Sequence, residues 1–309
     1  MQNNAPRLLI AGTGSGCGKT TVTSAVLRAL QRRGAALAAF KCGPDYIDPM
    51  FHTAVLGIPS RNLDLFFVDE TEVRGQLARH VPAGGLGIIE GVMGFYDGIS
   101  GTSDAASAAH LARATDTPVV LVVRPRGQSL SLAAEIGGFR DFAPNTLRGV
   151  ILNGVSKAMY PFYRAIAEKA GLTVYGCLPP VPEAEIPDRH LGLVTAQEIG
   201  DLQHKLDLLA DAAEEGLDLD GLLALAHTAP PLADESARRF RRWRTGRCAS
   251  QSRATVLSAF TMRTTLTYCA RWARRSWIFL RSKTKSCRKT STGCTSAAGI
   301  PNCTRSSSP

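Results

Sequence analysis

The last quarter of this 309-residue sequence lacks acidic side chains, since residues 236–309 contain no Asp and no Glu. They hold 17 of the 36 basic residues, all three Trp and five of the eight Cys. Residues 1–235 hold the other 19 basic residues and all 26 acidic ones, so the formal charge of +10 divides into −7 and +17. This asymmetry excludes one homogeneous basic protein and indicates an acidic globular part joined to a segment of different composition.

Long apolar runs and paired cysteines are also missing. No run approaches the ~20 apolar residues that a membrane helix needs, and Met1–Arg7 lacks the charged and apolar regions of a signal peptide. Cys17, Cys42 and Cys177 form no CxxC pair, which argues against a disulfide framework or a zinc site in the first 235 residues. We therefore expect a soluble cytoplasmic protein that has no membrane partner.

Short apolar runs alternate with amphipathic segments in the acidic part of the chain. This alternation is typical of an α/β fold with a mostly parallel sheet and helices on both faces. The segment 228–236, TAPPLADES, is predicted to be a linker. We expect strands at 7–11, 36–41, 86–90, 118–123, 149–153 and 172–177, and helices at 20–33, 104–115, 129–137, 159–170 and 195–215.

A phosphate loop is the strongest local signal, GTGSGCGKTT at residues 12–21, between an expected strand and an expected helix. Glycines let successive backbone N–H groups face a phosphate, and the helix N-terminus adds partial positive charge. We expect Lys19 to reach the β- and γ-phosphates of ATP and the Thr20 hydroxyl to hold Mg²⁺. The expected ATP-binding residues of the loop are Gly14, Ser15, Gly16, Cys17, Gly18, Lys19, Thr20 and Thr21.

The loop departs from the usual GxxxxGK[ST] pattern at one place. Thr13 stands where the pattern has Gly, and the preceding glycine, Gly12, comes one position early. A glycine-rich turn that caps a helix is the alternative interpretation. Three alternating glycines and GKTT directly after a strand favour the phosphate loop. Cys17 is interpreted as a small loop residue and not as a nucleophile.

Carboxylates follow two further strands, where ligands of open α/β sheets bind. Asp45 and Asp48 lie in KCGPDYIDPMFH, just after the strand at 36–41, and Glu90 ends the strand at 86–90. They could bind Mg²⁺ or orient a phosphoryl acceptor, with Glu90 in the place of a second metal ligand. Turn formation beside the two prolines of the first segment, and an ordinary acid at the end of the second strand, are the alternatives.

Three other polar residues stay ambiguous. Asn153 ends the strand at 149–153 and could contact the nucleotide base, or it could be structural. His52 and His190 are as compatible with a structural role as with a ligand role.

Six segments together resemble the cobyrinate a,c-diamide synthase family, ATP- and glutamine-dependent amidases of the corrin pathway. They occur in the family's order over about residues 7–195, and GPDYIDP followed by NLDL is the most specific combination. The modified phosphate loop also looks like that of dethiobiotin synthetase, a fold relative that activates a carboxylate with ATP. The segments are GTGSGCGKTTVT, KCGPDYIDPMFH, PSRNLDLFF, EGVMGFYDG, GVILNGV and PDRHLGLV.

The resemblance implies a P-loop NTPase-like fold of the dethiobiotin-synthetase type and a reaction of cobalamin biosynthesis. The γ-phosphate of ATP would pass to the a and c carboxylates of cobyrinic or hydrogenobyrinic acid, and ammonia from glutamine would turn each acyl phosphate into an amide. It implies Thr20, Asp45 and Glu90 as Mg²⁺ ligands, a catalytic set of Lys19, Asp45, Asp48 and Glu90, and a substrate-facing loop with Tyr46 and Asp48.

Two other functions remain open at this point, as does a homodimer. A relative that amidates a nickel tetrapyrrole shares these motifs. A partitioning ATPase has a second Lys in its loop, KGGxGKT, where this chain has Gly14, and GPDYIDP is foreign to such proteins.

The basic tail is best explained by a shifted reading frame. The family's class I glutaminase domain should begin near residue 245, yet the tail shows no sustained periodicity. When the third base of each codon is joined to the first two of the next, residues 257–270 admit AFCFYYEDNLDLLR and residues 291–304 admit DGLYLGGGYPELY. Both stretches resemble the start of that domain. A basic arm that binds nucleic acid is the alternative.

A frameshift between about residues 232 and 246 is therefore predicted. It divides the chain into an ATP-binding domain at 1–230, a linker at 231–245 and a disordered out-of-frame remnant at 246–309. In this interpretation the tail's charge indicates no nucleic-acid partner, no tail Cys is the glutaminase nucleophile, and the chain stops before the segment that would contain it.

Overall fold

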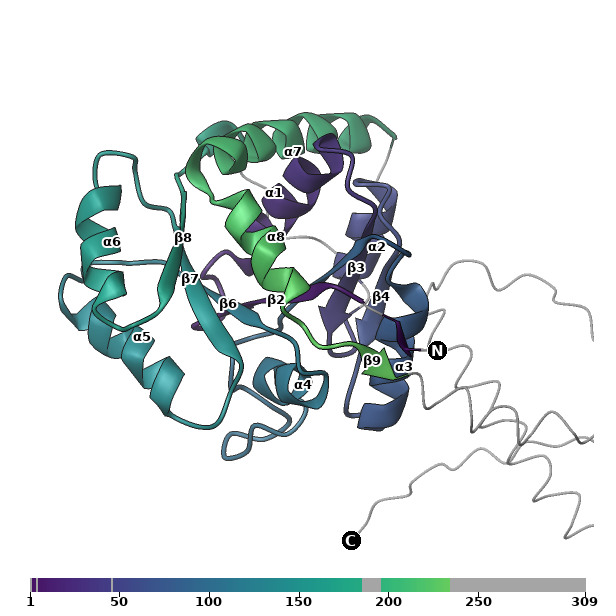
Figure 1. The fold of residues 1–309 in the computed structure, drawn as a ribbon. Coiled ribbons are helices and arrows are strands. Elements are labelled where there is room, and N and C mark those ends of the chain that lie inside the picture. Colours follow the sequence, from purple (N-terminus) through teal and green to yellow (C-terminus); the bar gives the residue numbers. More distant parts are fainter. Residues whose placement is uncertain (1, 4, 46, 185–195, 234–309) are drawn as a thin grey trace, which may run out of the picture. The chain divides into compact units, whose positions relative to one another are not determined.

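The computed structural model describes residues 2–3, 5–45, 47–184 and 196–233 (Figure 1). Tyr46, His190 and the predicted remnant at 246–309 lie outside these residues, so the predicted disorder of the tail does too. Within the described ranges, no helix combines the length and the apolar character needed to cross a bilayer.

Seven parallel strands form one sheet in the order β4-β3-β5-β2-β6-β7-β8 (Figure 1). The order reverses around β2, and the carboxyl ends of all seven strands meet at one edge, where open α/β sheets bind ligands. The strands are β2 (Arg7–Gly12), β3 (Leu37–Cys42), β4 (Ser60–Leu63), β5 (Leu86–Glu90), β6 (Val119–Val123), β7 (Leu147–Asn153) and β8 (Thr173–Leu178).

Two apolar layers cover the sheet because its central strands are apolar on both sides. Along β2, Leu8 and Ile10 join one buried cluster, and Leu9 and Ala11 join the other. The first cluster includes side chains from α1 (Lys19–Arg32), α2 (Ile47–Ala54), α7 (Ala196–Gly216), α8 (Leu219–His227) and the 3₁₀ turn η1 (Pro182–Ala184). The second includes side chains from α3 (Glu70–His80), α4 (Ala108–Ala114), α5 (Ser131–Asp141) and α6 (Tyr160–Glu168).

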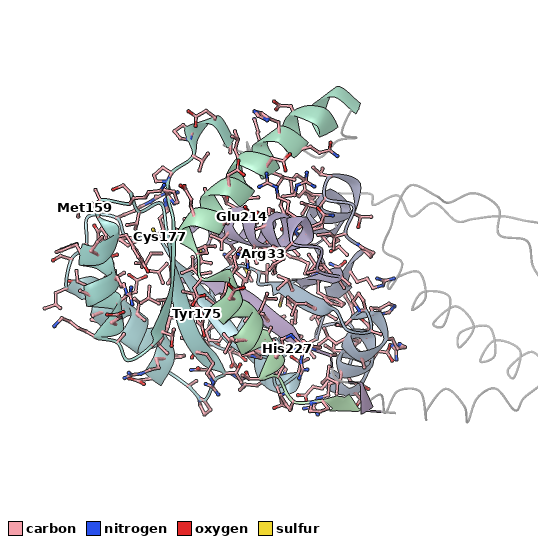
Figure 2. The ribbon with its side chains drawn as sticks, turned by 45° about the horizontal axis from the view of Figure 1, so that its top comes forward. Arg33, Met159, Tyr175, Cys177, Glu214 and His227 are labelled. Carbon is pink, nitrogen blue, oxygen red and sulfur yellow. The ribbon has the colours of Figure 1, made fainter. Side chains whose placement is uncertain are left out.

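A bulge in β8 changes which layer its side chains enter. Tyr175 packs in the first cluster and Cys177 in the second, although an even spacing would place both on one face. Gly176 between them has φ +109°, and the register of β7 with β8 shifts beside it. Tyr175 and Cys177 are labelled on this strand in Figure 2. The left-handed backbone that a bulge needs here is available to glycine without strain.

Ion pairs join the first helix to the two C-terminal helices. Arg28 of α1 lies 2.7 Å from Asp207 of α7. Arg33, which follows α1 and is labelled in Figure 2, lies 2.8 Å from Asp220 of α8. These exposed or half-buried pairs add little free energy individually, but they show that α7 and α8 belong to the same folded unit as the phosphate loop.

The sequence-based strands are all present, and the predicted helices agree within a few residues. The helix predicted at 104–115 begins later, as α4, because the Ser107 hydroxyl accepts a hydrogen bond from His110 N and caps it there. The sequence reasoning missed β4, α2, α3 and α8. Strand β4, at the sheet edge, is mostly polar, and in α3 the buried apolar side chains are few, so neither shows a clear apolar period.

The predicted linker needs a correction at its start. Leu232 and Ala233 form β9, which pairs antiparallel with β1 (Gln2–Asn3). Just before it, Pro230 O accepts a hydrogen bond of 2.9 Å from the guanidinium of the fully buried Arg7. A strand of two residues has no detectable period, so the proline-rich composition misled the prediction. Residues 234–245 of the linker lie outside the described residues.

Candidate functional site

The loop between β2 and α1 needs glycine for two reasons. Gly16 and Gly18 have φ +74° and +93°, in the left-handed region that glycine adopts without strain. A Cβ on Gly18 would also lie only 1.9 Å from Asn153 Nδ2. The same Nδ2 donates a hydrogen bond of 2.9 Å to Cys17 O. Asn153, at the end of β7, therefore holds the loop from the neighbouring half of the sheet.

Lys19 crosses back over this loop. Its ammonium donates to Gly14 O at 2.8 Å, and burial lowers the pKa of Lys19, with the charge of Lys41 lowering it further. A Cβ at Gly12 would lie 2.7 Å from Lys19 Cγ, which explains a glycine one position earlier than the usual pattern. An ammonium that is largely withdrawn from water and bonded to one carbonyl is suited to exchange that carbonyl for a phosphate oxygen.

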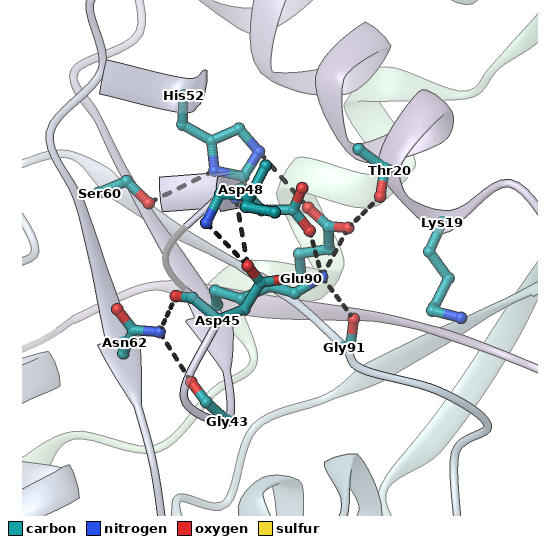
Figure 3. A network of polar contacts seen from close by, with 12 residues as sticks. Lys19, Thr20, Gly43, Asp45, Asp48, His52, Ser60, Asn62, Glu90 and Gly91 are labelled. Atoms are coloured by element: carbon teal, nitrogen blue, oxygen red, sulfur yellow. Dashed lines mark hydrogen bonds and ion pairs between the residues drawn. The ribbon is translucent and has the colours of Figure 1, made fainter. Parts of the chain in front are cut away.

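A buried network links the loop to three neighbouring elements (Figure 3). Thr20 Oγ1, on the first turn of α1, donates to Glu90 Oε1 at 2.5 Å. The ammonium of Lys41, at the end of β3, donates to the same Oε1 at 2.9 Å and to Gly91 O at 3.2 Å, and lies 2.6 Å from Asp48 Oδ2. Lys41 therefore holds two carboxylates together beside the phosphate loop.

The electrostatics of the network favour its ionised form. Burial alone would raise the pKa of the fully buried Glu90 carboxyl, but the charge of Lys41 and hydrogen bonds from His52 and Thr20 hold it well below its ordinary range. Burial would lower the pKa of Lys41, yet the carboxylates of Glu90 and Asp48 raise it above its ordinary value. Two carboxylates thus share one ammonium, which leaves an excess of negative charge that suits a bound cation.

His52 closes the network on the side of β4. This fully buried histidine of α2 has Nε2 3.4 Å from Glu90 Oε2 and Nδ1 3.3 Å from Ser60 Oγ (Figure 3). The two carboxylate oxygens of Glu90 therefore face different groups, Oε1 the loop and Oε2 the histidine.

The Asp45 carboxylate makes its hydrogen bonds with the backbone at the start of α2. Its Oδ1 accepts hydrogen bonds from Ile47 N at 2.8 Å and Asp48 N at 3.4 Å, so the carboxylate caps the start of α2. Asn62 Nδ2 donates to Asp45 O and, at 2.8 Å, to Gly43 O, which fixes the loop against β4. Of the predicted magnesium ligands, Thr20 and Glu90 contact each other directly, whereas the Asp45 carboxylate bonds to the backbone of α2.

The oxygen donors present fit magnesium bound together with a nucleotide. In the described ranges, no group of three or more His, Cys, Asp and Glu side chains converges as a metal site. Mg²⁺ in nucleotide sites usually takes one or two protein oxygens and several from phosphates and water. The Thr20 hydroxyl and Glu90 Oε1, which meet at 2.5 Å, supply two such oxygens.

Lys41 is the main site residue that sequence reasoning missed. A signal was present, because a lysine ends the otherwise apolar strand LAAFKC and lysine is seldom buried unless it is paired. Asp48, predicted as catalytic and substrate-facing, joins Glu90 through this lysine, and Tyr46 lies outside the described residues.

Comparison with known proteins identifies the family to which this chain is similar. Residues 8–194 match the model of a protein family described as the CobQ/CobB/MinD/ParA nucleotide binding domain. The chain is 39% identical over 228 residues to the cobyrinate a,c-diamide synthase of Clostridium tetani, covering 74% of this chain and 51% of that protein. It is 40% identical over 235 residues to the enzyme of the same name from Listeria innocua, covering 75% and 52%.

A third such enzyme, from Clostridium acetobutylicum, is 44% identical over 220 residues, covering 70% of this chain and 50% of that protein. The chain thus spans about half the length of the curated relatives it matches. Among solved structures, the hydrogenase maturation factor HypB of Archaeoglobus fulgidus matches with a TM-score of 0.35 and 13% identity, covering 72% of this chain and 88% of that one.

Proposed function

The chain belongs to the CobQ/CobB/MinD/ParA nucleotide-binding domain family, and on this premise we propose that it is an ATP-dependent ligase that converts corrinoid carboxylates into amides. The relatives named cobyrinate a,c-diamide synthase support the a and c carboxylates of cobyrinic acid as the groups that are amidated. We place the reaction in cytoplasmic cobalamin biosynthesis, with hydrogenobyrinic acid as the alternative acceptor. The matched region covers 51% and 52% of the length of these two relatives.

The observation that carries the proposal is the position of Lys41. Its ammonium lies 2.9 Å from the same Glu90 oxygen that accepts the Thr20 hydrogen bond. In phosphate-loop enzymes, the hydroxyl at the position of Thr20 binds the metal beside the γ-phosphate. A second buried cation at this end of the nucleotide suits a reaction in which two anions, a phosphate and a carboxylate, must approach each other.

In the proposed reaction, a carboxylate oxygen of the corrinoid attacks the γ-phosphorus of ATP, and the bond from that phosphorus to the β,γ-bridging oxygen breaks. The products are an acyl phosphate and ADP. Ammonia then attacks the acyl carbon and loses a proton, and inorganic phosphate leaves with the carboxylate oxygen. Phosphoryl transfer of this kind depends on positioning and charge neutralisation more than on covalent help from the protein.

We assign the residues as follows. Lys19 and the backbone N–H groups of the loop neutralise the phosphates, and Thr20 and Glu90 hold Mg²⁺, which would supply further charge neutralisation at the γ-phosphate. Asp45 orders the start of α2 through its cap and so places Asp48, and we keep its charged carboxylate in the catalytic set as a third candidate ligand of Mg²⁺. Tyr46 and Asp48 face the corrinoid. Asn153 contributes to nucleotide binding by holding the loop at Cys17.

The nitrogen source and the tail form a linked proposal. We place the ATP-binding domain at 1–233, so that it includes β9, and interpret 246–309, after a linker at 234–245, as an out-of-frame glutaminase remnant. Free ammonia is then the donor that this chain can use. The support comes from the two tail stretches that admit family-like sequence in the shifted frame. Resequencing codons 230–250 tests it, and a clean sequence without an insertion or deletion would reject the frameshift.

The test of function uses the purified full chain with cobyrinic acid, ATP, Mg²⁺ and an ammonium salt. We expect ADP release that depends on the corrinoid and mass spectra that show conversion of two carboxylates to amides. Glutamine in place of ammonium should give no product. A parallel reaction with a nickel tetrapyrrole carboxylate tests the alternative substrate. Corrinoid-independent ATP hydrolysis without an amide product would reject the proposal.

A further inference from the structure

Two buried atoms in the network face each other and have no other partner. His52 Nε2 and Glu90 Oε2 are both withdrawn from solvent, and neither makes a shorter polar contact in the part of the chain that the structure describes. They lie 3.4 Å apart (Figure 3). A buried polar atom left without a hydrogen bond is destabilising, so this single approach has to satisfy both atoms.

The charge of Glu90 decides which way the contact runs. The Lys41 ammonium lies 2.9 Å from Glu90 Oε1, and a carboxylate that pairs with a buried ammonium accepts hydrogen bonds through its other oxygen, Oε2. A bare ring nitrogen would present its lone pair to that oxygen, and therefore Nε2 carries the proton. Nδ1 then accepts a hydrogen bond from the Ser60 hydroxyl, 3.3 Å away. Ser60, His52 and Glu90 form a directed relay from β4 through α2 to the end of β5.

The relay ends on the oxygen that faces away from the phosphate loop. A glutamate carboxylate rotates freely about its last bond unless both oxygens are held. Thr20 and Lys41 hold Oε1, but Lys41 alone could also attract Oε2 and turn the carboxylate. The contact from His52 opposes this rotation and keeps Oε1 directed to Thr20.

We propose that His52 is a positioning residue that fixes the Glu90 carboxylate for binding the metal of a metal–nucleotide complex. This inference rests on the proposed function only in taking Glu90 as a metal ligand. Residues that hydrogen-bond to metal-binding carboxylates set ligand orientation, and their loss typically weakens metal affinity or activity by about 10–100-fold. His52 is expected to act through Glu90 without touching ATP or the corrinoid.

The experiment measures binding of a fluorescent, non-hydrolysable ATP analogue to the full chain, with and without Mg²⁺. His52→Phe keeps a ring in the buried position but removes both nitrogens. We expect the Mg²⁺ concentration for half-maximal enhancement to rise by about 10–100-fold, whereas binding in EDTA stays unchanged. His52→Gln retains an N–H donor at a similar reach and should recover most of the enhancement. His80→Phe, a half-buried histidine on α3, is the matched control and should behave as wild type.

Coupling to Glu90 separates positioning from packing. In a Glu90→Gln background, His52→Phe should weaken the Mg²⁺ effect no further, because the oxygen that His52 orients has lost its charge. An equal additional loss in that background would overturn the proposal, as would wild-type Mg²⁺ dependence in folded His52→Phe. If His52→Phe does not fold, the same Mg²⁺ titration of His52→Gln and Ser60→Ala tests the relay instead. A His52→Gln variant whose half-maximal Mg²⁺ concentration is far above that of Ser60→Ala contradicts it. The binding experiment contains no corrinoid, so its result does not depend on whether the amidation proposal is correct.

Discussion

Lys41 Nζ lies 2.9 Å from Glu90 Oε1, and the two residues are register partners at the carboxyl ends of β3 and β5. The pairing of the strands therefore places a cation against the strand-end carboxylate before any ligand is bound. Asp48, 2.6 Å from the same ammonium, ties the start of α2 to this pair. The site is thus part of the sheet and not an addition to its surface loops.

Removing the ammonium should destabilise the fold as well as the site. Lys41→Met leaves the buried Glu90 and Asp48 carboxylates without their shared cation, and breaking a buried pair in this way costs about 3–5 kcal/mol. We expect a loss of that size in the free energy of unfolding from urea denaturation. Lys157→Met, which removes a well-exposed pair with Glu215, is the control and should cost less than about 1 kcal/mol. Equal losses in the two variants would contradict the assignment.

Two glycines of the phosphate loop should respond differently to alanine. At Gly18, a Cβ meets Asn153 Nδ2 at 1.9 Å and the backbone is left-handed, so Gly18→Ala should disrupt the loop and abolish ATP binding. At Gly14, a Cβ meets nothing within 4 Å, so Gly14→Ala should leave the loop conformation intact. Calorimetric titration with MgATP distinguishes them. Wild-type affinity in Gly18→Ala would show that the loop has another conformation.

The two roles of Asp45 can be separated by the choice of substitution. Asn at this position can still cap α2, so Asp45→Asn should keep thermal stability and lower turnover more than ATP affinity. Asp45→Ala also removes the cap, which typically costs about 0.5–2 kcal/mol. Glu90→Gln should likewise lower turnover more than ATP affinity. The measurements are thermal melting and the ATP-dependent amidation rate, and wild-type turnover in Asp45→Asn would remove its charge from the catalytic set.

The ion pair also predicts how stability depends on pH. The pKa of Glu90 is lowered from its ordinary 4.5, so its contribution is complete above pH 4.5 and is lost as the pH falls below it toward the folded-state pKa. The pKa of Lys41 is raised from 10.5, so its contribution is complete below pH 10.5 and declines above it. Each group adds a slope of about 1.4 kcal/mol per pH unit in its own range.

Urea denaturation as a function of pH checks this assignment. Glu90→Gln should flatten the acid decline, because the group that titrates there is gone. If the free energy of unfolding of Glu90→Gln falls with acid as steeply as that of the wild type, other carboxyls cause the fall. The prediction for Glu90 would then be wrong.

The sequence was sufficient for six of the seven strands of the sheet, all but the polar edge strand β4, because buried parallel strands are continuous apolar runs, as in VVLVV of β6. It also placed Lys19, Thr20 and Glu90 correctly at strand and helix ends. It did not reveal Lys41 and left the role of His52 open, since the importance of both comes from partners about 40–50 positions away that only strand pairing brings near. Strand β9 was missed for the same reason: its two residues are held by the distant N-terminus.

The central claim is that a substrate carboxylate is activated by the γ-phosphate of ATP, and oxygen transfer tests it most directly. Cobyrinic acid with ¹⁸O-labelled carboxylates is incubated with the full chain, ATP, Mg²⁺ and ammonium, and the released phosphate is analysed by mass spectrometry. The acyl-phosphate route predicts one ¹⁸O atom in the phosphate for each amide formed. Amide formation with unlabelled phosphate, or phosphate release without an amide, would contradict it.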